Sequence, residues 1–386
     1  MDNIHAATKK ELPATIQLVN TVFIEDWAKG TRMEEKFPIF LSEKNLDHIQ
    51  IITDQGKPVS HVGYYQTKVI IQGAAAIQVG SIGSVCTDPA YRGKGLASQI
   101  LDVVEAKAQK EGIQVLLISG ERSLYTRRQC IQVGGFIEFS LKGRQPATAP
   151  DFEMRTYQTE DTPEIYALYN QEPVRFYRSH EEFSTLLKAG LLPFYWTNKL
   201  YVIKTNGHAV AYFFLGLAHQ QPLWGEISEF AGDRGALSAA FNLVCQQEGL
   251  HHLVVRTSLK DPLSAYLRQS VEEGGKNADQ VGTVKIINSA GLMKNLRPYF
   301  LQYVPRKMLS ALHWAEKEGR FYLSCDGETV EIGDLTSLTQ LVFGFSPGHR
   351  LSETVSAFLV RHPQAGEFIH SVFPLPMPWA GNLNFI

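Results

Sequence analysis

The chain has 386 residues, of which 44% are hydrophobic and 20% are charged, a composition typical of a folded protein with two or three domains. Its 37 Lys and Arg nearly balance 39 Asp and Glu, leaving a net charge of -2, which argues against nucleic acid as a partner. The apolar runs are too short for a membrane span, and the N-terminal residues lack a signal-peptide core. We therefore expect a cytoplasmic protein without a membrane span.

The cysteines give no sign of a metal site or of a disulfide framework. Cys86, Cys130, Cys245 and Cys325 are scattered along the chain. They form no Cys-x-x-Cys pair and have no histidine at the spacing of a zinc site. Four cysteines in so long a chain do not make a disulfide-stabilised scaffold. We therefore expect no metal.

Up to about residue 150 the sequence alternates between strand-like and helix-like runs. The clearest helix begins at Leu96 and is ended by Gly112, and its apolar residues recur at helical spacing. Further helices are expected at 9–23, 33–43 and 121–133. Strands are expected at 4–8, 48–53, 59–65, 69–73, 76–87, 115–119 and, last, 136–141.

A Pro/Ala-rich stretch, 143–150, is typical of a linker. The following residues, to about 280, repeat the alternation of strand-like and helix-like runs seen before it. Helices are expected at 162–169, 180–188 and 234–248, with strands at 154–158, 200–204, 209–217, 225–229 and 252–256. Many folds share such an α/β pattern. We interpret these residues as a second copy of the first fold. We place the domains at 1–147, 148–285 and 286–386.

The last segment changes character. Residues 293–314 are expected to be rich in helix, 319–331 to form strands, and 335–343 and 351–361 to form helices. The tail, 368–386, contains no Asp, Glu, Lys or Arg, yet it is rich in aromatic residues and proline. We expect this tail to be docked on protein, because exposing it to water would forfeit its burial energy.

The most informative motif is Arg92-Gly93-Lys94-Gly95-Leu96-Ala97. A glycine-rich turn between a strand and an amphipathic helix presents free backbone amides at the positive end of the helix. Glycine lets the backbone approach an anion closely, and Arg92 and Lys94 add positive charge, so the turn suits a diphosphate. The alternative is a simple tight turn. The motif is neither a P-loop nor GxGxxG.

In context, Val85-Cys86-Thr87-Asp88-Pro89-Ala90-Tyr91-Arg92-Gly93-Lys94-Gly95-Leu96-Ala97 resembles the acetyl-CoA motif of the GNAT N-acetyltransferases. Arg92, Gly95 and Ala97 fill the three named positions of the family's Arg/Gln-x-x-Gly-x-Gly/Ala pattern. The resemblance covers roughly residues 1–142. It implies that acetyl-CoA is the cosubstrate and that Val85, Cys86 and Thr87 hold its pantetheine arm and thioester carbonyl.

The whole chain resembles the Eis-type (enhanced intracellular survival) acetyltransferases. That resemblance implies an α/β (α+β) fold class: tandem GNAT acyl-CoA N-acyltransferase folds, followed by a C-terminal domain similar to sterol carrier proteins. The second copy lacks the acetyl-CoA pattern at its equivalent turn, 230–237, where Glu229 and Asp233 would repel phosphates. We therefore expect it to be degenerate and to help wall the substrate pocket. The family pattern also implies a homo-oligomer, a trimer or hexamer.

The resemblance implies the catalytic groups as well. Tyr125 occupies the position of the family's tyrosine acid, and a phenol is protonated at neutral pH. The base is expected to be the terminal carboxylate of Ile386, which presumes that this residue is the natural end of the chain. Glu121 is a candidate for positioning Tyr125 or the substrate amine. The alternatives are a packed tyrosine, a frayed terminus, or a covalent role for Cys86, although a buried strand cysteine is usually inert.

The expected reaction is direct transfer of acetyl to a primary amine of a small polycationic, aminoglycoside-like molecule, a substrate class that comes from the resemblance alone. A protein lysine or an N-terminal amine is an alternative acceptor. A different class of function is a non-catalytic CoA- or lipid-binding module. Release of free thiol from acetyl-CoA over a panel of amines distinguishes these readings.

Overall fold

The structure is a computed structural model that describes residues 3–24, 32–143, 151–190, 196–218, 221–271, 274–384 and 386. The expected linker lies outside the described residues, apart from Gly143. Among the helices of the described residues, none has both the length and the apolar composition needed to cross a membrane.

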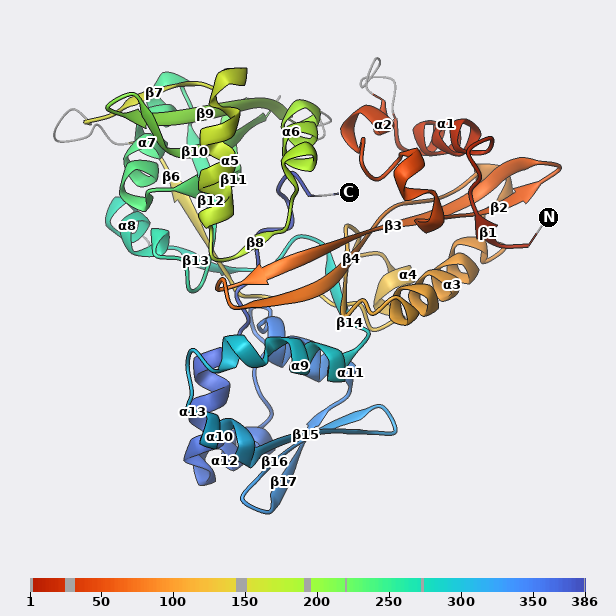
Figure 1. The fold of residues 1–386 in the computed structure, drawn as a ribbon, viewed down its shortest axis with the longest axis vertical. Coiled ribbons are helices and arrows are strands. Elements are labelled where there is room, and N and C mark those ends of the chain that lie inside the picture. Colours follow the sequence, from red (N-terminus) through yellow and green to blue (C-terminus); the bar gives the residue numbers. More distant parts are fainter. Residues whose placement is uncertain are drawn as a thin grey trace.

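The first sheet has the strand order β1-β2-β3-β4-β5-β14, and β8 pairs with the far end of β3. Its strands are β1 (His5–Ala6), β2 (Ile49–Asp54), β3 (Lys57–Ile71), β4 (Ala75–Thr87), β5 (Val115–Ile118), β8 (Arg175–Phe176) and β14 (Thr283–Ile286). The helices of this part are α1 (Leu12–Phe23), α2 (Met33–Lys36), α3 (Leu96–Lys110) and α4 (Ser123–Thr126). Figure 1 shows β3 and β4 crossing the middle of the molecule as one long twisted pair.

The second sheet has the order β13-β6-β12-β11-β10-β9-β7. Its strands are β6 (Phe136–Leu141), β7 (Glu153–Thr156), β9 (Trp196–Thr205), β10 (His208–Ala218), β11 (Trp224–Gly232), β12 (His252–Ser258) and β13 (Lys276–Ala278). The helices here are α5 (Thr162–Gln171), α6 (His180–Ala189), α7 (Arg234–Gln247) and α8 (Leu263–Ser270). The parallel pair β11 and β12 and the helix between them repeat the arrangement of β4, α3 and β5, as a second copy of the first fold requires.

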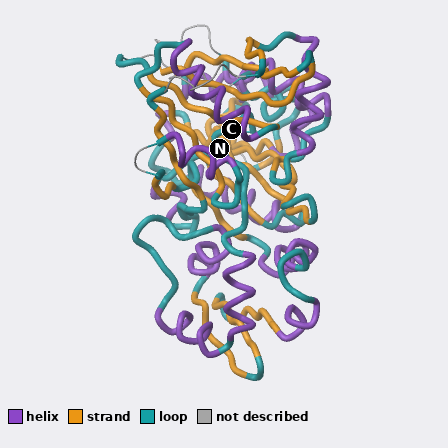
Figure 2. The backbone as a smooth tube through the Cα atoms, turned by 90° about the vertical axis from the view of Figure 1, so that its left-hand side faces the viewer, coloured by secondary structure: helices purple, strands orange, loops and turns teal. Residues whose placement is uncertain are grey.

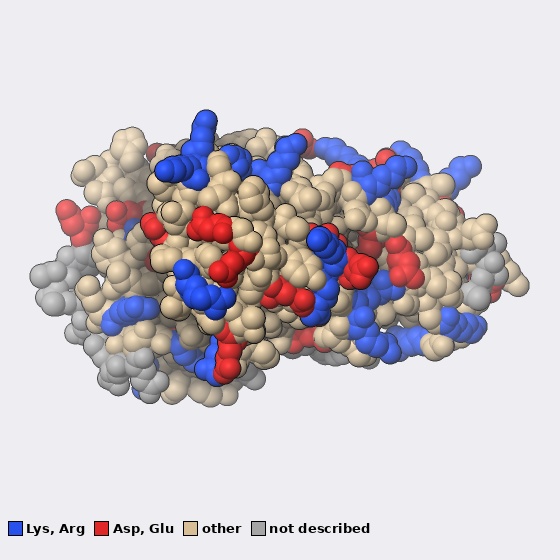
Figure 3. Space-filling view, turned by 90° about the horizontal axis from the view of Figure 1, so that it is seen from below, with Lys and Arg blue, Asp and Glu red and all other residues tan. Residues whose placement is uncertain are grey.

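The third part forms the lower portion of the molecule in Figures 1 and 2. It contains a small sheet of β15 (Leu312–Lys317), β16 (Arg320–Cys325) and β17 (Glu328–Gly333). Its helices are α9 (Ser289–Phe300), α10 (Arg306–Ala311), α11 (Leu335–Phe343), α12 (Glu353–Arg361) and α13 (Pro363–Val372). Lys and Arg are interspersed with Asp and Glu on the face seen from below (Figure 3), as expected for a nearly neutral chain.

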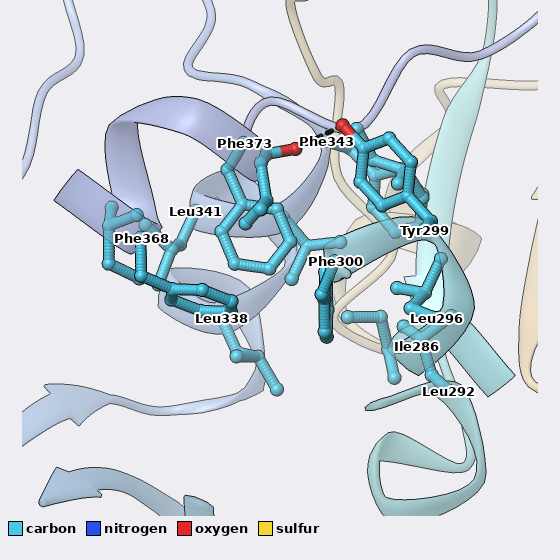
Figure 4. Packing of buried hydrophobic residues seen from close by; sticks show 14 of the residues in the cluster. Ile286, Leu292, Leu296, Tyr299, Phe300, Leu338, Leu341, Phe343, Phe368 and Phe373 are labelled. Atoms are coloured by element: carbon cyan, nitrogen blue, oxygen red, sulfur yellow. Dashed lines mark hydrogen bonds between the residues drawn. The ribbon is translucent and has the colours of Figure 1, made fainter. Parts of the chain in front are cut away.

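The core of this third part is aromatic. The rings of Phe300, Phe368 and Phe373 meet edge to face, with centroids 5.1 to 6.1 Å apart, the arrangement that aromatic pairs prefer. Figure 4 shows these rings beside Leu338 and Leu341. The same buried cluster extends to β3 and β4 of the first sheet, so the third part shares a core with the first.

Two strands cross between the sheets. β6, expected as the last strand of the first fold, pairs instead with β12 and β13 of the second sheet. β14 returns to the first sheet and takes the place beside β5. Gly135, with φ +92°, supplies the turn that directs the chain toward the other sheet, a conformation that favours glycine. The first two folds are therefore tied together by exchanged strands.

Four expected elements differ from the structure. The helix expected at 121–133 is only the short α4, because the chain turns at Gln129, where φ is +62°, and Ile131 then bridges to Val284. The strands expected at 59–65 and 69–73 are one strand, β3. The helix expected at 33–43 ends at Lys36.

The tail was expected to start at residue 368, but α13 continues to Val372. No helix was expected at 363–372, and α13 overlaps the start of the expected tail. Beyond it, Phe373, Leu375, Met377 and Leu383 are all buried, so the described part of the tail is docked on the protein, as its composition indicates.

Candidate active site

The glycine-rich turn joins β4 to α3 in an open conformation. Asp88 accepts a hydrogen bond from the Ala90 amide at 2.8 Å and so starts the turn. Gly93 and Gly95 both have positive φ, +78° and +74°, which favours glycine. Gly95 is the N-cap of α3, and no side chain caps this helix end. The first amides of α3 are therefore available to an anion from solvent.

Two cations and an aromatic ring flank this turn. The Nε of Arg92 donates to the Thr87 carbonyl at 3.3 Å, and Lys94 lies over the ring of Tyr91, with Nζ 4.6 Å from the centroid. The Tyr91 hydroxyl in turn donates to Asp54 at 2.6 Å. Arg92 and Lys94 are exposed, so both can turn toward a bound diphosphate.

The equivalent turn of the second fold is closed by its own side chains. Asp233 caps α7 by accepting from the Ala236 amide at 2.7 Å, which occupies the position that an anion would take. Arg234 is held by Glu172 at 2.6 Å and by Asp261 at 3.0 Å. The self-capped turn supports a structural role for the second fold.

The negative charge of Glu229 was expected to repel phosphate, but this residue is part of an ion pair. Its carboxylate does not stand as a free negative charge, because both of its oxygens pair with the Arg178 guanidinium at 2.8 and 2.9 Å. The Tyr212 hydroxyl donates a further hydrogen bond to it at 3.0 Å. The expected repulsion of phosphate by Glu229 is therefore wrong, because Arg178 neutralises its charge.

In the first fold, β4 separates from β5 just before the turn. The two strands pair in parallel from Val79 to Ile82 of β4. Ser84 then adopts a φ of +50°, and the register with β3 shifts there as in a β-bulge. The residues that follow pair with β3 but not with β5. Their free edge faces the opening between the two strands, where an extended ligand can pair with it.

The expected cofactor-contacting residues lie along this path, from the strand edge to the helix. Val85, Thr87 and Ala97 are half-buried, Cys86 and Leu96 are buried, and Arg92, Gly93, Lys94 and Gly95 are exposed. Burial raises the pKa of the Cys86 thiol to about 12. The thiol is therefore protonated at neutral pH, which disfavours the covalent role considered from the sequence.

The C-terminal residue lies directly against β4 at the point of separation. A Cβ placed on Gly83 would come within 2.6 Å of the carbonyl carbon of Ile386 and 2.9 Å of its oxygen. The terminal group therefore packs on the main chain of β4, and only glycine leaves room for it. Figure 1 shows the C-terminus between α6 and the part that contains α1 and α2.

The second fold holds this tail in place through Arg178. Its guanidinium, paired with Glu229, donates from Nε to the side-chain carbonyl of Asn384 at 2.7 Å. The amide of Asn384 also donates to the side chain of Asn382 at 2.8 Å. Arg178 is only 1% exposed. Sequence reasoning missed this residue, since a lone arginine between two elements carries no motif that indicates its partner.

Tyr125 lies on α4, the short helix after β5. Its ring packs on Gly120, where an added Cβ would be 2.5 Å from the ring. Ser119, the residue before, lines a small hollow together with Ile386. Burial raises the pKa of Tyr125 to about 12, so its hydroxyl is a proton donor at neutral pH. Glu121 is exposed at the start of this turn.

A second hollow beside Ile386 is largely apolar. Phe37, Phe40 and Leu186 line it together with Lys36 and Tyr65 among others. The Lys36 ammonium donates to the Ala189 carbonyl at 2.7 Å, and burial lowers the pKa of this lysine. Apart from the terminal group itself, the described lining of this hollow contains no carboxylate.

Comparison with known proteins agrees with this arrangement. Residues 3–130 match the family model described as an acetyltransferase (GNAT) domain. A search of curated protein sequences gives no match. The first fold is therefore a GNAT acetyltransferase domain, and the chain is an enzyme of the N-acetyltransferase class.

Solved structures share the fold over nearly the whole chain. A probable N-acyltransferase from Enterococcus faecalis has a TM-score of 0.63 and 15% identity, with 97% of each chain covered. A GCN5-related N-acetyltransferase from Kribbella flavida has a TM-score of 0.62 and 12% identity, covering 100% of this chain and 98% of that one. Eis1 from Mycobacterium abscessus has a TM-score of 0.59 and 11% identity, covering 99% and 100%.

His61 lies on β3 beside the bulge of β4 and is a buried histidine. Its ring is fully buried, Nδ1 lies 2.9 Å from the Ser84 carbonyl, and burial lowers its pKa to about 4. Since an unfolded histidine has a pKa of about 6.5, the unfolded chain takes up a proton before the folded chain does. This group therefore costs about 3 kcal/mol of folding stability between pH 7 and pH 4.

Urea unfolding at several pH values checks this prediction. We expect His61→Gln to lose less stability than the wild type on acidification, whereas replacement of the exposed His208 should leave the pH dependence unchanged. Equal losses in wild type and His61→Gln would contradict a buried neutral imidazole.

Proposed function

We propose that this enzyme transfers acetyl from acetyl-CoA to a primary amine by direct attack. The observation that carries the proposal is the position of the Ile386 terminus on Gly83, where β4 leaves β5. When the chain ends at Ile386, its carboxylate would lie where a thioester held along β4 presents its carbonyl carbon.

The proposed CoA site follows from the geometry of β4 and α3. The diphosphate is bound by the backbone amides of 93–97, with Arg92 and Lys94 neutralising its charge. The pantetheine arm runs along Val85, Cys86 and Thr87, on the edge that β5 does not occupy. The uncapped helix end and its positive-φ glycines support this assignment.

In the proposed reaction, the neutral amine attacks the thioester carbonyl, so that a C–N bond forms and the C–S bond breaks. The Ile386 carboxylate, ionised at neutral pH, receives the excess proton from the nitrogen directly or through water. Tyr125 donates its proton to the departing CoA sulfur and is reprotonated from solvent. The raised pKa of Tyr125 supports a donor role. Glu121 is proposed to help position the amine.

We propose a small polycationic, aminoglycoside-like amine as acceptor, together with an Eis-type organisation of domains 1–147, 148–285 and 286–386. The last of these would be sterol-carrier-like, and the protein a cytoplasmic homo-oligomer. The support is the motif resemblance and the whole-chain likeness in fold to Eis1. The apolar lining beside Ile386 adds no charge argument for a polycation, so a lysine or N-terminal amine of a protein is the second candidate.

Free-thiol release from acetyl-CoA tests the proposal over aminoglycosides, linear polyamines, lysine peptides and peptides with free N-termini. Turnover of polyamines and aminoglycosides alone supports the first acceptor class, and turnover of peptides alone supports the second. No turnover with any amine would contradict the transfer reaction and favour a CoA- or lipid-binding module.

Gly95→Glu should reduce CoA affinity at least 100-fold in calorimetry, because the new carboxylate stands where the diphosphate is expected to bind. Gly112→Glu is the matched control, since this glycine has a similar φ of +81° at the other end of α3. Both variants carry the same backbone strain, so equal CoA affinities would contradict the phosphate site.

Tyr125→Phe should lower kcat by about 10²–10⁴-fold, the usual contribution of a general acid, and leave CoA affinity within a few fold. Steady-state kinetics and calorimetry measure the two quantities. Tyr64→Phe removes another buried hydroxyl, one that contacts Glu111, and should retain most activity. Full activity of Tyr125→Phe would exclude the phenol as the acid.

Deletion of 384–386 should cut kcat much more than CoA affinity. A glycine added after Ile386 is a sharper variant, because it displaces the carboxylate without removing any side chain. Ile386→Val, which retains the terminal carboxylate at the same position, should stay active. An active glycine-extended enzyme would remove the terminal carboxylate from the mechanism.

A further inference from the structure

A cluster of metal-binding residue types lies in the third part of the chain, away from the acetyl-transfer site. Cys325 ends β16, Asp326 belongs to the tight turn that follows, and Glu328 begins β17. His362 comes from a different segment, the junction of α12 and α13. Sequence spacing could not indicate this group, because the histidine follows the cysteine only after two intervening helices.

The geometry brings the potential ligand atoms together. One atom each from Cys325, Asp326 and His362 lie within 4.8 Å of one another. The Cys325 sulfur is 3.5 Å from Oδ2 of Asp326, which is itself 3.9 Å from Nδ1 of His362. Glu328 lies at the other ring nitrogen, with Oε2 3.2 Å from Nε2 of the same histidine.

The histidine is oriented by a carboxylate on its other ring nitrogen. His362 is 8% exposed, and its Nε2 lies 3.2 Å from Oε2 of Glu328. A carboxylate on one ring nitrogen fixes the tautomer and orientation of a metal-binding histidine. Nδ1 of His362 is therefore the nitrogen that faces Asp326 and can bind an ion.

The environment of the sulfur is also suited to a metal. Cys325 is 1% exposed, and the backbone amide of Ala365 donates a hydrogen bond to its sulfur. Such outer hydrogen bonds are typical of metal-bound ligands. The carboxylates of Asp326 and Glu328 are exposed, which leaves an entry path for an ion.

We propose that Cys325, Asp326 and His362 form a divalent metal site that suits Zn²⁺, with Glu328 orienting the histidine from its other ring nitrogen. One sulfur, one imidazole nitrogen and one carboxylate oxygen are ligands that zinc accepts, and a water completes the tetrahedron. On binding, the thiol proton passes to solvent and the ion exchanges all but one of its ligand waters for the three side chains.

The site would join the β16–β17 turn to the start of α13, the helix from which the tail leaves toward the first fold. This role is independent of the proposed acetyl transfer. The ion would stabilise the third part of the chain and would take no part in the reaction.

Metal binding by the full-length protein tests the proposal. After treatment with a chelator, the protein is dialysed against Zn²⁺ or Co²⁺ and analysed for metal content, and the Co²⁺ form is examined for sulfur-to-metal charge-transfer absorption. We expect one ion per chain, the charge-transfer band, and a higher Tm with Zn²⁺. Cys325→Ser and His362→Gln should weaken Zn²⁺ binding at least 100-fold and abolish the Tm shift.

Cys245→Ser is the matched control, since it removes another buried cysteine and should keep full binding. If the buried variants fail to fold, Glu328→Gln, at an exposed position, should still weaken Zn²⁺ binding by about 10-fold or more. Absence of stoichiometric metal in the wild type, or equal binding by Glu328→Gln and wild type without a charge-transfer band, would overturn the proposal.

Discussion

The buried ion pair between Arg178 and Glu229 is the interaction on which the arrangement of the candidate site depends. It joins the second fold to the tail of the third part, because the same guanidinium holds Asn384, close to the end of the chain. A buried charge stripped of its partner costs about 3–5 kcal/mol, so neither residue is replaced without consequence. The terminus reaches β4 of the first fold because the second fold fixes its approach.

The two tandem folds illustrate how one architecture carries or loses an anion site. In the first fold the helix after the parallel strand starts with Gly95 and has no side-chain cap. In the second, Asp233 caps the equivalent helix itself. An amide that already donates to a neighbouring carboxylate has no hydrogen bond left for a phosphate, and the negative charge of the carboxylate repels the phosphate. The second fold then contributes through Arg178, a residue that supports the site from outside the reaction.

Local patterns accounted for much of the fold. The residues expected on the inner face of α3, namely Leu96, Ile100, Leu101, Val104 and Ala108, are all buried, because helical periodicity is a property of the sequence within a few turns. Long-range pairings were not accessible in this way. The places of β6 and β14 in exchanged sheets depend on which edges remain free after folding, and a strand's own residues do not encode that choice.

In the candidate site, too, groups of consecutive residues could be predicted and groups assembled from distant segments could not. The glycine-rich turn could be recognised because its chemistry lies in consecutive residues, whereas Arg178 and the cluster at Cys325 and His362 are assembled from distant segments. The expectation of no metal rested on sequence spacing, which is informative only for ligands close together in the chain. The docked tail was predictable in part, since its lack of charge indicated burial but not the surface that receives it.

A structure of the protein with acetyl-CoA tests the central claim most directly. The account predicts that the diphosphate contacts the amides at the start of α3 and that the acetyl group lies between β4 and β5, beside the Ile386 terminus and the Tyr125 hydroxyl. Coenzyme bound elsewhere, or an acetyl group remote from both of these groups, would contradict it.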